Sequence, residues 1–197
     1  IIVDDCSSDR SGEIIDSLKT NFIEIKSVKH KKNLGKGAGI KSGVELSTGD
    51  IILIQDADLE YNPEDYDNLL KPFLETDADV VYGSRFLGGK YVKLCFFWHF
   101  VANKILTILC NVFTNLNMTD METGYKLFKS DVIKSIELKE KSFGIEPEIT
   151  VKLGKKGFIF YEVPISYSGR SYDDGKKIGL RDAFIAIFCI FKYRFFD

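Results

Sequence analysis

An apolar run followed by alternating acids, residues 51–60, narrows the choice of folds for this chain more than any other stretch. The acids stand at every second position after the run: Asp56, Asp58 and Glu60. A short apolar run between turn signals is typical of a strand buried on both faces, and open α/β sheets bind ligands at the carboxyl ends of such strands. Because side chains alternate along an extended chain, the acids are predicted to point the same way, which suits a hard divalent cation. The alternative is a solvated turn, since an isolated Asp-x-Asp is a common chance match.

Strands and helices are predicted to alternate through the first half of the chain. The apolar strand patterns fall at residues 1–3, 23–28, 51–54 and 78–82, with helical patterns between them. This alternation predicts an α/β fold with a doubly wound, mainly parallel sheet flanked by helices. A length of 197 residues suits one domain. Because the chain opens inside a strand and without a methionine, we expect a segment upstream of Ile1.

Charge and cysteine content argue against two classes of site. The formal net charge of −2 gives no electrostatic reason to expect a nucleic-acid partner. The four cysteines show no C-x-x-C spacing and there are only two histidines, so a zinc site is not expected. Free thiols suit a reducing cytosol.

Two local positive charges stand where an anion could bind. Lys36 lies in the glycine-rich segment 33–39 before a helix, where backbone N–H groups can approach a phosphate. The spacing is not that of a P-loop, and a plain helix start is the alternative. Arg85 follows the strand pattern 78–82, where an arginine serves either as a two-pronged phosphate ligand or as a surface residue.

The second half contains two apolar helical segments, residues 94–113 and 183–196. Both are too short in their uninterrupted part to span a bilayer. They are interpreted either as buried helices or as helices lying in a membrane interface with the apolar face down. The loop 168–177 between them carries Arg170, Lys176 and Lys177, which suits either a surface loop or an anionic headgroup.

Six short motifs occur in the order found in family 2 glycosyltransferases, which the chain resembles over nearly its whole length. They lie at residues 4–9, 33–37, 56–58, 82–85, 119–126 and 170–177. The chain is most similar to the dolichyl- or polyprenyl-phosphate sugar synthases, the dolichol-phosphate mannose synthase type. Glu60 stands where that family often has Gln, and Gly124 where it often has Cys, and neither difference removes a charge that the chemistry needs.

The resemblance implies a single GT-A domain over residues 1–197, without the N-terminal strand and loop of the family, and with interfacial amphipathic helices towards the C-terminus. It implies inverting transfer of a sugar from GDP-mannose or UDP-glucose to a polyprenyl or dolichyl phosphate, by a peripheral protein on the cytosolic face of a membrane. A membrane-protein subunit or anchor is a further partner that it allows. The alternatives are a family 2 enzyme with another acceptor, in polysaccharide or glycolipid synthesis, and a non-catalytic membrane-associated module. A processive polymerase would need a Gln-x-x-Arg-Trp segment, which is absent.

The resemblance also implies roles for individual residues. Mg²⁺ or Mn²⁺ is expected on Asp56, Asp58 and Glu60, and the catalytic residues are expected to be Asp58, Arg85 and Asp120. The residues expected to bind the nucleotide sugar are Asp4, Asp5, Asp9, Lys36, Asp56 and Glu146. Those expected to hold the acceptor phosphate are Arg85, His99, Arg170, Lys176 and Lys177, although a histidine on an apolar helix is as often structural. A phosphate monoester has a second pKa of about 6, so the acceptor is already a nucleophile and needs no dedicated base.

Overall fold

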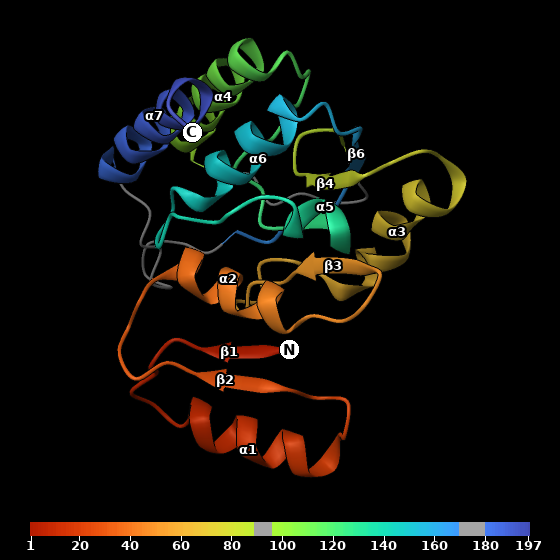
Figure 1. Cartoon of the computed structure of the whole chain (residues 1–197), viewed down its shortest axis with the longest axis vertical. Helices are drawn as coiled ribbons and strands as arrows, with labels where there is room; N and C mark the ends of the chain where they lie inside the picture. The colour runs from red at the N-terminus through yellow and green to blue at the C-terminus, as the bar shows by residue number, and fades with distance from the viewer. Residues whose placement is uncertain (89–95, 170–179) are drawn as a thin grey trace.

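The computed structural model describes residues 1–88, 96–169 and 180–197 (Figure 1). The elements of its first half are β1 (Ile2–Asp4), α1 (Ser11–Asn21), β2 (Ser27–Lys29), α2 (Lys36–Leu46), β3 (Ile51–Ile54), the 3-10 helix η1 (Pro63–Asp65), α3 (Tyr66–Glu75) and β4 (Val80–Ser84). Those of the second half are α4 (Phe97–Thr114), β5 (Lys126–Lys129), α5 (Ser130–Lys134), α6 (Ile145–Lys155), β6 (Phe160–Pro164) and α7 (Leu180–Phe195).

The strands of the described ranges form two sheets. β1 and β2 pair in parallel, and a second sheet has the order β3-β5-β4-β6. In the second sheet β4 and β6 run parallel, whereas β5 runs antiparallel to both β3 and β4. The predicted α/β fold with flanking helices is confirmed, but the pairing is mixed. After β4 the chain passes through the long helix α4 and an extended turn. It then returns to the sheet from the opposite end, so that β5 lies between β3 and β4 and runs antiparallel to both.

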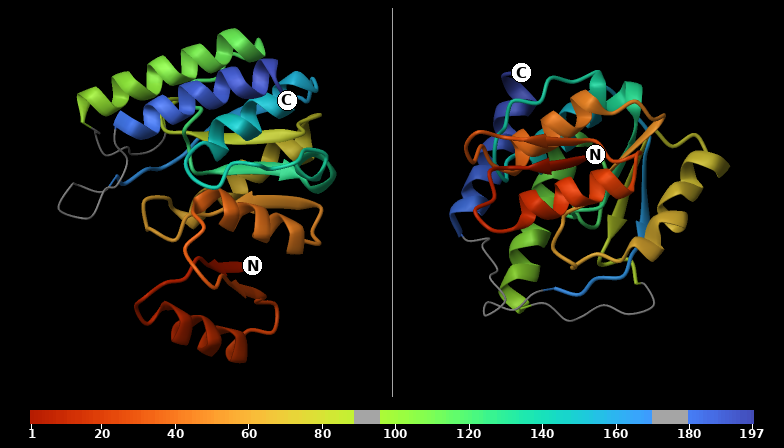
Figure 2. Two further views of the ribbon diagram at one scale, coloured as in Figure 1. Left: turned by 60° about the vertical axis from the view of Figure 1, so that its left-hand side comes forward. Right: turned by 90° about the horizontal axis from the view of Figure 1, so that it is seen from below.

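The strand β4 has a hydrophobic layer on each side because its side chains alternate between the faces of the sheet. Val80 and Tyr82 pack into the cluster that includes residues of α4, α6 and α7, whereas Val81 packs into the cluster on the α3 side. All three side chains are fully buried. Figures 1 and 2 show α4, α6 and α7 together on one side of this sheet. The burial of β4 fixes the position of Arg85, which follows its last residue.

The helices α4 and α7 lie side by side (Figure 2). Each exposes an apolar face to solvent. Their inward side chains, such as Cys110 and Ile190, are fully buried. Many of their exposed side chains are large and apolar: Phe97, Trp98, Phe100, Ile105, Ile108, Val112, Phe184, Phe188, Phe191 and Phe195. In the part of the chain that the structure describes, no helix has the length and apolar character needed to cross a bilayer. An exposed apolar face of this kind marks an interaction surface.

Candidate active site

Side chains in the loop after β3 alternate between half-buried and exposed. Asp56, Asp58 and Glu60 are half-buried, and the residues between them are exposed. The backbone N–H of Glu60 donates to Oδ1 of Asp58 over 3.1 Å, and Leu59 has a φ of +60°, a strained value for a bulky side chain. Within the described residues, no group of three or more His, Cys, Asp or Glu side chains is gathered closely enough to hold a metal ion. The three acids share their half-buried environment, and their role as metal ligands stays a prediction.

Lys36 bridges two of the residues that were predicted to bind the nucleotide sugar. Its Nζ lies 2.9 Å from Oδ2 of Asp56 and 2.8 Å from Oε1 of Glu146, which stands in the first turn of α6. Gly35, with a φ of +94°, makes the turn from which α2 starts and so places Lys36 between them. Burial acts to lower the pKa of Lys36, but the charges of Glu146 and Asp56 outweigh burial and raise that pKa. The ammonium is therefore held charged between two carboxylates.

Arg85 and Asp120 form a buried, two-pronged ion pair. Nε and Nη2 of Arg85 each lie 2.7 Å from an oxygen of Asp120, and the backbone N–H of Arg85 donates to Oδ2 over 3.1 Å. Asn103 of α4 donates from Nδ2 to Oδ1 over 3.1 Å. Burial acts to raise the pKa of Asp120, but Arg85 outweighs it, so this pKa lies below its ordinary value. One edge of the guanidinium predicted to hold a phosphate is thus already bound to a carboxylate.

Tyr61 and Gly124 connect this ion pair to the Lys36 bridge. The hydroxyl of Tyr61 accepts a hydrogen bond from the backbone N–H of Gly124 over 2.7 Å. A Cβ on Gly124 would come within 2.8 Å of both Oδ2 of Asp56 and the Tyr61 ring. On the other side, the ring centre of Tyr167 lies 5.3 Å from that of Tyr61 and 5.1 Å from the Arg85 guanidinium carbon. The two charged groups therefore belong to one site.

Both carboxylate oxygens of Asp5 are hydrogen-bonded within the protein. Oδ1 accepts from the backbone N–H of Leu34 over 2.8 Å and lies 2.7 Å from Nδ1 of His30, while Oδ2 accepts from the N–H of Gly35 over 2.7 Å. The other ring nitrogen of His30 lies 2.9 Å from Oγ of Ser42. Asp5 thus fixes the loop that carries Lys36, and His30 is a residue that sequence reasoning missed because nothing in its spacing marks it.

Asp4 and Asp9 stabilise the loop that follows β1. Oδ1 of Asp4 accepts from the backbone N–H of Ser7 over 2.7 Å, and Oδ1 of Asp9 accepts from that of Ser11 over 2.9 Å. Asp4 is buried, whereas Asp9 is exposed beside the start of α1. The structure therefore gives both acids a local role, and their contact with a nucleotide stays a prediction.

The glycine-rich segment packs backbone to backbone against residues 139–144. A Cβ on Gly37 would collide with the carbonyl of Glu140, and the N–H of Ala38 donates to the carbonyl of Lys141 over 3.2 Å. The Glu140 side chain accepts from Nζ of Lys192 on α7 over 2.8 Å. Only glycine permits so close an approach at position 37, so this segment is tied to the C-terminal helix through residues 139–144.

Lys126, which is buried, and Glu122, which is half-buried, are two ionisable residues that were not identified from the sequence. Nζ of Lys126 donates to the carbonyl of Met121 over 2.9 Å and to that of Thr123. Burial lowers the pKa of Lys126 to about 8, while burial and the charge of Glu146 raise that of Glu122 to about 7. Both residues lie in the motif 119–126, but a motif match carries no information on burial.

The residues predicted to hold the acceptor phosphate are only partly within the described structure. His99 lies half-buried in the first turn of α4, with its ring centre 5.9 Å from that of Phe96. Phe86, next to Arg85, packs on Phe100 with 5.3 Å between ring centres, so the start of α4 adjoins Arg85. The other three predicted residues lie outside the described residues: Arg170, Lys176 and Lys177.

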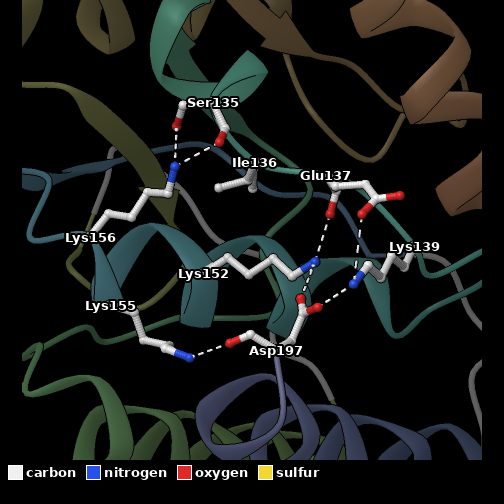
Figure 3. A pocket seen from close by; sticks show the side chains of 8 residues that line it. All are labelled: Ser135, Ile136, Glu137, Lys139, Lys152, Lys155, Lys156 and Asp197. Carbon is white, nitrogen blue, oxygen red and sulfur yellow. Dashed lines mark hydrogen bonds and ion pairs between the residues drawn. The ribbon is translucent and has the colours of Figure 1, made fainter.

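A hollow of about 230 Å³ lies at the other end of α6 from this site (Figure 3). It is lined by Ser135, Ile136, Glu137, Lys139, Lys152, Lys155, Lys156 and Asp197. Nζ of Lys152 lies 2.6 Å from Oδ2 of Asp197 and 2.8 Å from Oε1 of Glu148, and Nζ of Lys155 donates to the Asp197 backbone carbonyl over 2.6 Å. Lys155 lies nine residues after Glu146, which corresponds to about 14 Å along α6. The hollow therefore belongs to the attachment of the C-terminal residues and not to the candidate active site.

Comparison with known proteins gives one family and several relatives. The model of glycosyl transferase family 2 matches residues 1–137. An undecaprenyl-phosphate mannosyltransferase of Micrococcus luteus is 28% identical over 191 residues, covering 91% of this chain and 75% of that protein. A dolichol-phosphate mannosyltransferase of Pyrococcus furiosus is 26% identical over 181 residues, covering 91% of this chain and 50% of that protein.

A solved structure supports the fold. Glucosyl-3-phosphoglycerate synthase from Mycobacterium tuberculosis, in complex with Mn²⁺ and UDP-glucose, superposes with a TM-score of 0.67 at 16% sequence identity. The match covers 98% of this chain and 67% of that chain. At this identity the likeness concerns the fold, which is the GT-A fold.

Proposed function

Because the chain belongs to glycosyl transferase family 2, we propose that it transfers a sugar from a nucleotide sugar to a polyprenyl or dolichyl phosphate, with inversion at the anomeric carbon. The observation that carries the proposal is the meeting of Lys36, Asp56 and Glu146 in one site with the Arg85–Asp120 pair. The site offers cations for phosphates and carboxylates for a metal ion and for sugar hydroxyls. The names of the relatives from Micrococcus luteus and Pyrococcus furiosus support the lipid phosphate as acceptor.

The nucleotide sugar is expected on the Asp56 side of the site. Asp56, Asp58 and Glu60 are half-buried and lie within five residues of one loop, and carboxylate oxygens are the ligands that Mg²⁺ and Mn²⁺ prefer, although the described structure does not gather the three around one point. When bound, such an ion supplies positive charge to the diphosphate leaving group. Lys36 adds an ammonium for the same phosphates, and Oε2 of Glu146, buried and without a hydrogen-bond partner among the described residues, is suited to accept from a sugar hydroxyl.

The nucleoside is expected near the loop after β1, beside the glycine-rich segment. Asp4, Asp5 and Asp9 stand on that loop, and Asp5 holds the backbone at Gly35. A nucleoside placed there would extend its diphosphate towards Lys36.

The acceptor phosphate is expected on the Arg85 side of the site. Asp120 holds one edge of the Arg85 guanidinium and so fixes the direction of the side chain. His99 and the basic residues Arg170, Lys176 and Lys177 would complete the phosphate site. Because the phosphate is already a nucleophile, the role of these residues is to bind and orient it for attack at the anomeric carbon.

The apolar faces of α4 and α7 suit a lipid surface. Phe97 and Trp98, at the start of α4, are 66% and 77% exposed. The same end of α4 contacts the segment after β4 through Phe100 and Phe86. Aromatic side chains of this kind are favoured where a protein meets the headgroup region of a membrane. We place the protein peripherally on the cytosolic face, where nucleotide sugars would reach it.

The proposal is tested by sugar transfer to lipid. The full chain is incubated with GDP-mannose or UDP-glucose, a polyprenyl phosphate in vesicles, and Mg²⁺ or Mn²⁺, and labelled lipid is extracted into organic solvent. We expect lipid product from one donor, and its loss with EDTA or in Asp58→Asn. Asp50→Asn is the matched control, because Asp50 is exposed before β3.

Different failures separate the alternatives. Product formation that persists in EDTA would refute the metal role. Transfer to a water-soluble or glycolipid acceptor, with none to polyprenyl phosphate, would favour another family 2 activity. Binding to vesicles with neither nucleotide-sugar turnover nor transfer would identify a non-catalytic module.

A further inference from the structure

Lys36 occupies the position that a cation would take beside Asp56. Its ammonium contacts Asp56 at 2.9 Å and Glu146 at 2.8 Å, and the side chains of Asp56 and Glu146 are 27% and 7% exposed. We propose that this ammonium fills the cation site of Asp56 in the free protein, so that a divalent metal ion binds well only together with a nucleoside diphosphate that draws Lys36 away. The inference rests on the proposed function, which supplies the diphosphate.

The surroundings of Asp56 hold its carboxylate in place. Gly124 and the ring of Tyr61 lie so close that a Cβ on Gly124 would come within 2.8 Å of Oδ2 of Asp56. Gly35 fixes the start of α2, so the reach of Lys36 is also set by the backbone. A metal ion on the same oxygen would place two positive charges side by side, which is strongly unfavourable in a half-buried site. Metal and ammonium therefore compete for Asp56.

One oxygen of Glu146 is without a hydrogen-bond partner among the described residues even with Lys36 in place. One ammonium faces the carboxylates of Asp56 and Glu146, and Oε2 of Glu146 is buried without a hydrogen-bond partner in the described ranges. A self-sufficient structural ion pair would satisfy its buried oxygens. The unmet acceptor indicates that a further ligand completes the site.

A diphosphate resolves the competition. Its oxygens attract the Lys36 ammonium, which leaves Asp56 free for the metal ion. Glu146 stands on the other side of the ammonium and keeps the lysine within reach of the phosphates, so we assign Glu146 a positioning role towards Lys36. The free protein thus holds the place of the metal with its own side chain.

The test measures Mn²⁺ binding to the full chain without nucleotide, from the electron paramagnetic resonance signal of free Mn²⁺. Lys36→Met removes the competing charge, and Lys41→Met is the matched control, because Lys41 is an exposed lysine on the same helix. We expect Lys36→Met to bind Mn²⁺ at least about tenfold more tightly than wild type, the factor associated with one charge-assisted hydrogen bond. Lys41→Met should match wild type. The same Lys36→Met variant should bind GDP or UDP more weakly by calorimetry.

Opposite changes in the two affinities distinguish competition from damage to the fold. Equal Mn²⁺ affinities for Lys36→Met and Lys41→Met, or weaker binding of both ligands by Lys36→Met, would overturn the inference. Lys36→Met leaves the buried Glu146 without its ion-pair partner and could therefore fail to fold. In that case the variant Lys36→Met/Glu146→Gln is measured instead, and the same comparison of Mn²⁺ and nucleotide affinities applies. No sugar donor is present in the metal titration, so a failure of the proposed function appears separately, in the transfer assay.

Discussion

The buried pair Arg85–Asp120 should be energetically coupled, and a double-mutant cycle measures that coupling. Asp120 is fully buried and the Arg85 side chain is 14% exposed, with three hydrogen bonds between the two residues. Arg85→Met leaves a buried carboxylate that keeps its hydrogen bond from Asn103, and Asp120→Asn removes the carboxylate paired with the buried guanidinium. Breaking a buried pair in this way costs about 3–5 kcal/mol of unfolding free energy.

The double variant removes both charges, so it should be less destabilised than the two single variants together. We expect a coupling energy of about 2 kcal/mol or more, within the range for residues that share hydrogen bonds. The assay is urea unfolding followed by circular dichroism for wild type, both single variants and the double variant. The control cycle uses Arg10 and Glu13, an ion pair whose side chains are 85% and 74% exposed, and its coupling should be indistinguishable from zero.

Additive effects at Arg85 and Asp120, within about 0.5 kcal/mol, would refute the reasoning. That result would mean that the two charges do not depend on each other for their burial. If, in addition, Arg85→Met lowered sugar transfer while leaving stability unchanged, the guanidinium would be free for the acceptor phosphate rather than held by Asp120.

The remaining predictions concern pH, the Lys36 loop and the membrane. The pKa of Glu122 is raised from 4.5 to about 7, so the folded state binds its proton more tightly, and the unfolding free energy should fall as the pH rises from 4.5 through 7 relative to Glu122→Gln, measured by urea unfolding. His30→Ala removes the contact with the carboxylate of Asp5 and should weaken GDP or UDP binding about fivefold in calorimetry, the effect of about one hydrogen bond. An equally large effect of Ser42→Ala would contradict the view that His30 acts through Asp5. Phe97→Ser should reduce flotation with vesicles, and Phe22→Ser should not, since Phe22, just beyond α1, is 54% exposed against 66% for Phe97 but lies away from α4 and α7; equal losses would argue against a specific lipid-facing surface.

Local patterns in the sequence predicted the elements better than their assembly. The run 51–54 corresponds to β3, and the helical pattern expected between it and the strand pattern 78–82 corresponds to η1 with α3, because apolar periodicity reports which face of a single element is buried. The place of β5 could not be predicted in this way. It pairs with β3 and β4 across long stretches of chain, and that choice depends on packing against both layers of the core.

The candidate site shows the same division between local and long-range information. Arg85 and Asp120 were each identified from short motifs, but their ion pair joins residues 35 positions apart, and motif order carries no distances. The burial of Glu122 and Lys126 follows from the strand that Lys126 begins, which sequence periodicity did not indicate. His30 lies beside Asp5 because β1 and β2 pair in parallel and each of the two residues follows the end of one of these strands.

The contact between Gly37 and the carbonyl of Glu140 links α7, whose apolar face we propose for a lipid surface, to the glycine-rich loop that we propose for the phosphates. Glu140 accepts from Lys192 of α7 with its side chain and touches the glycine-rich segment with its backbone, so the path from α7 runs through one ion pair and then directly from backbone to backbone. Docking on a vesicle should therefore change amide hydrogen exchange at residues 36–39, measured by mass spectrometry. Exchange that stays the same while α7 becomes protected would show that the loop is insulated from the membrane.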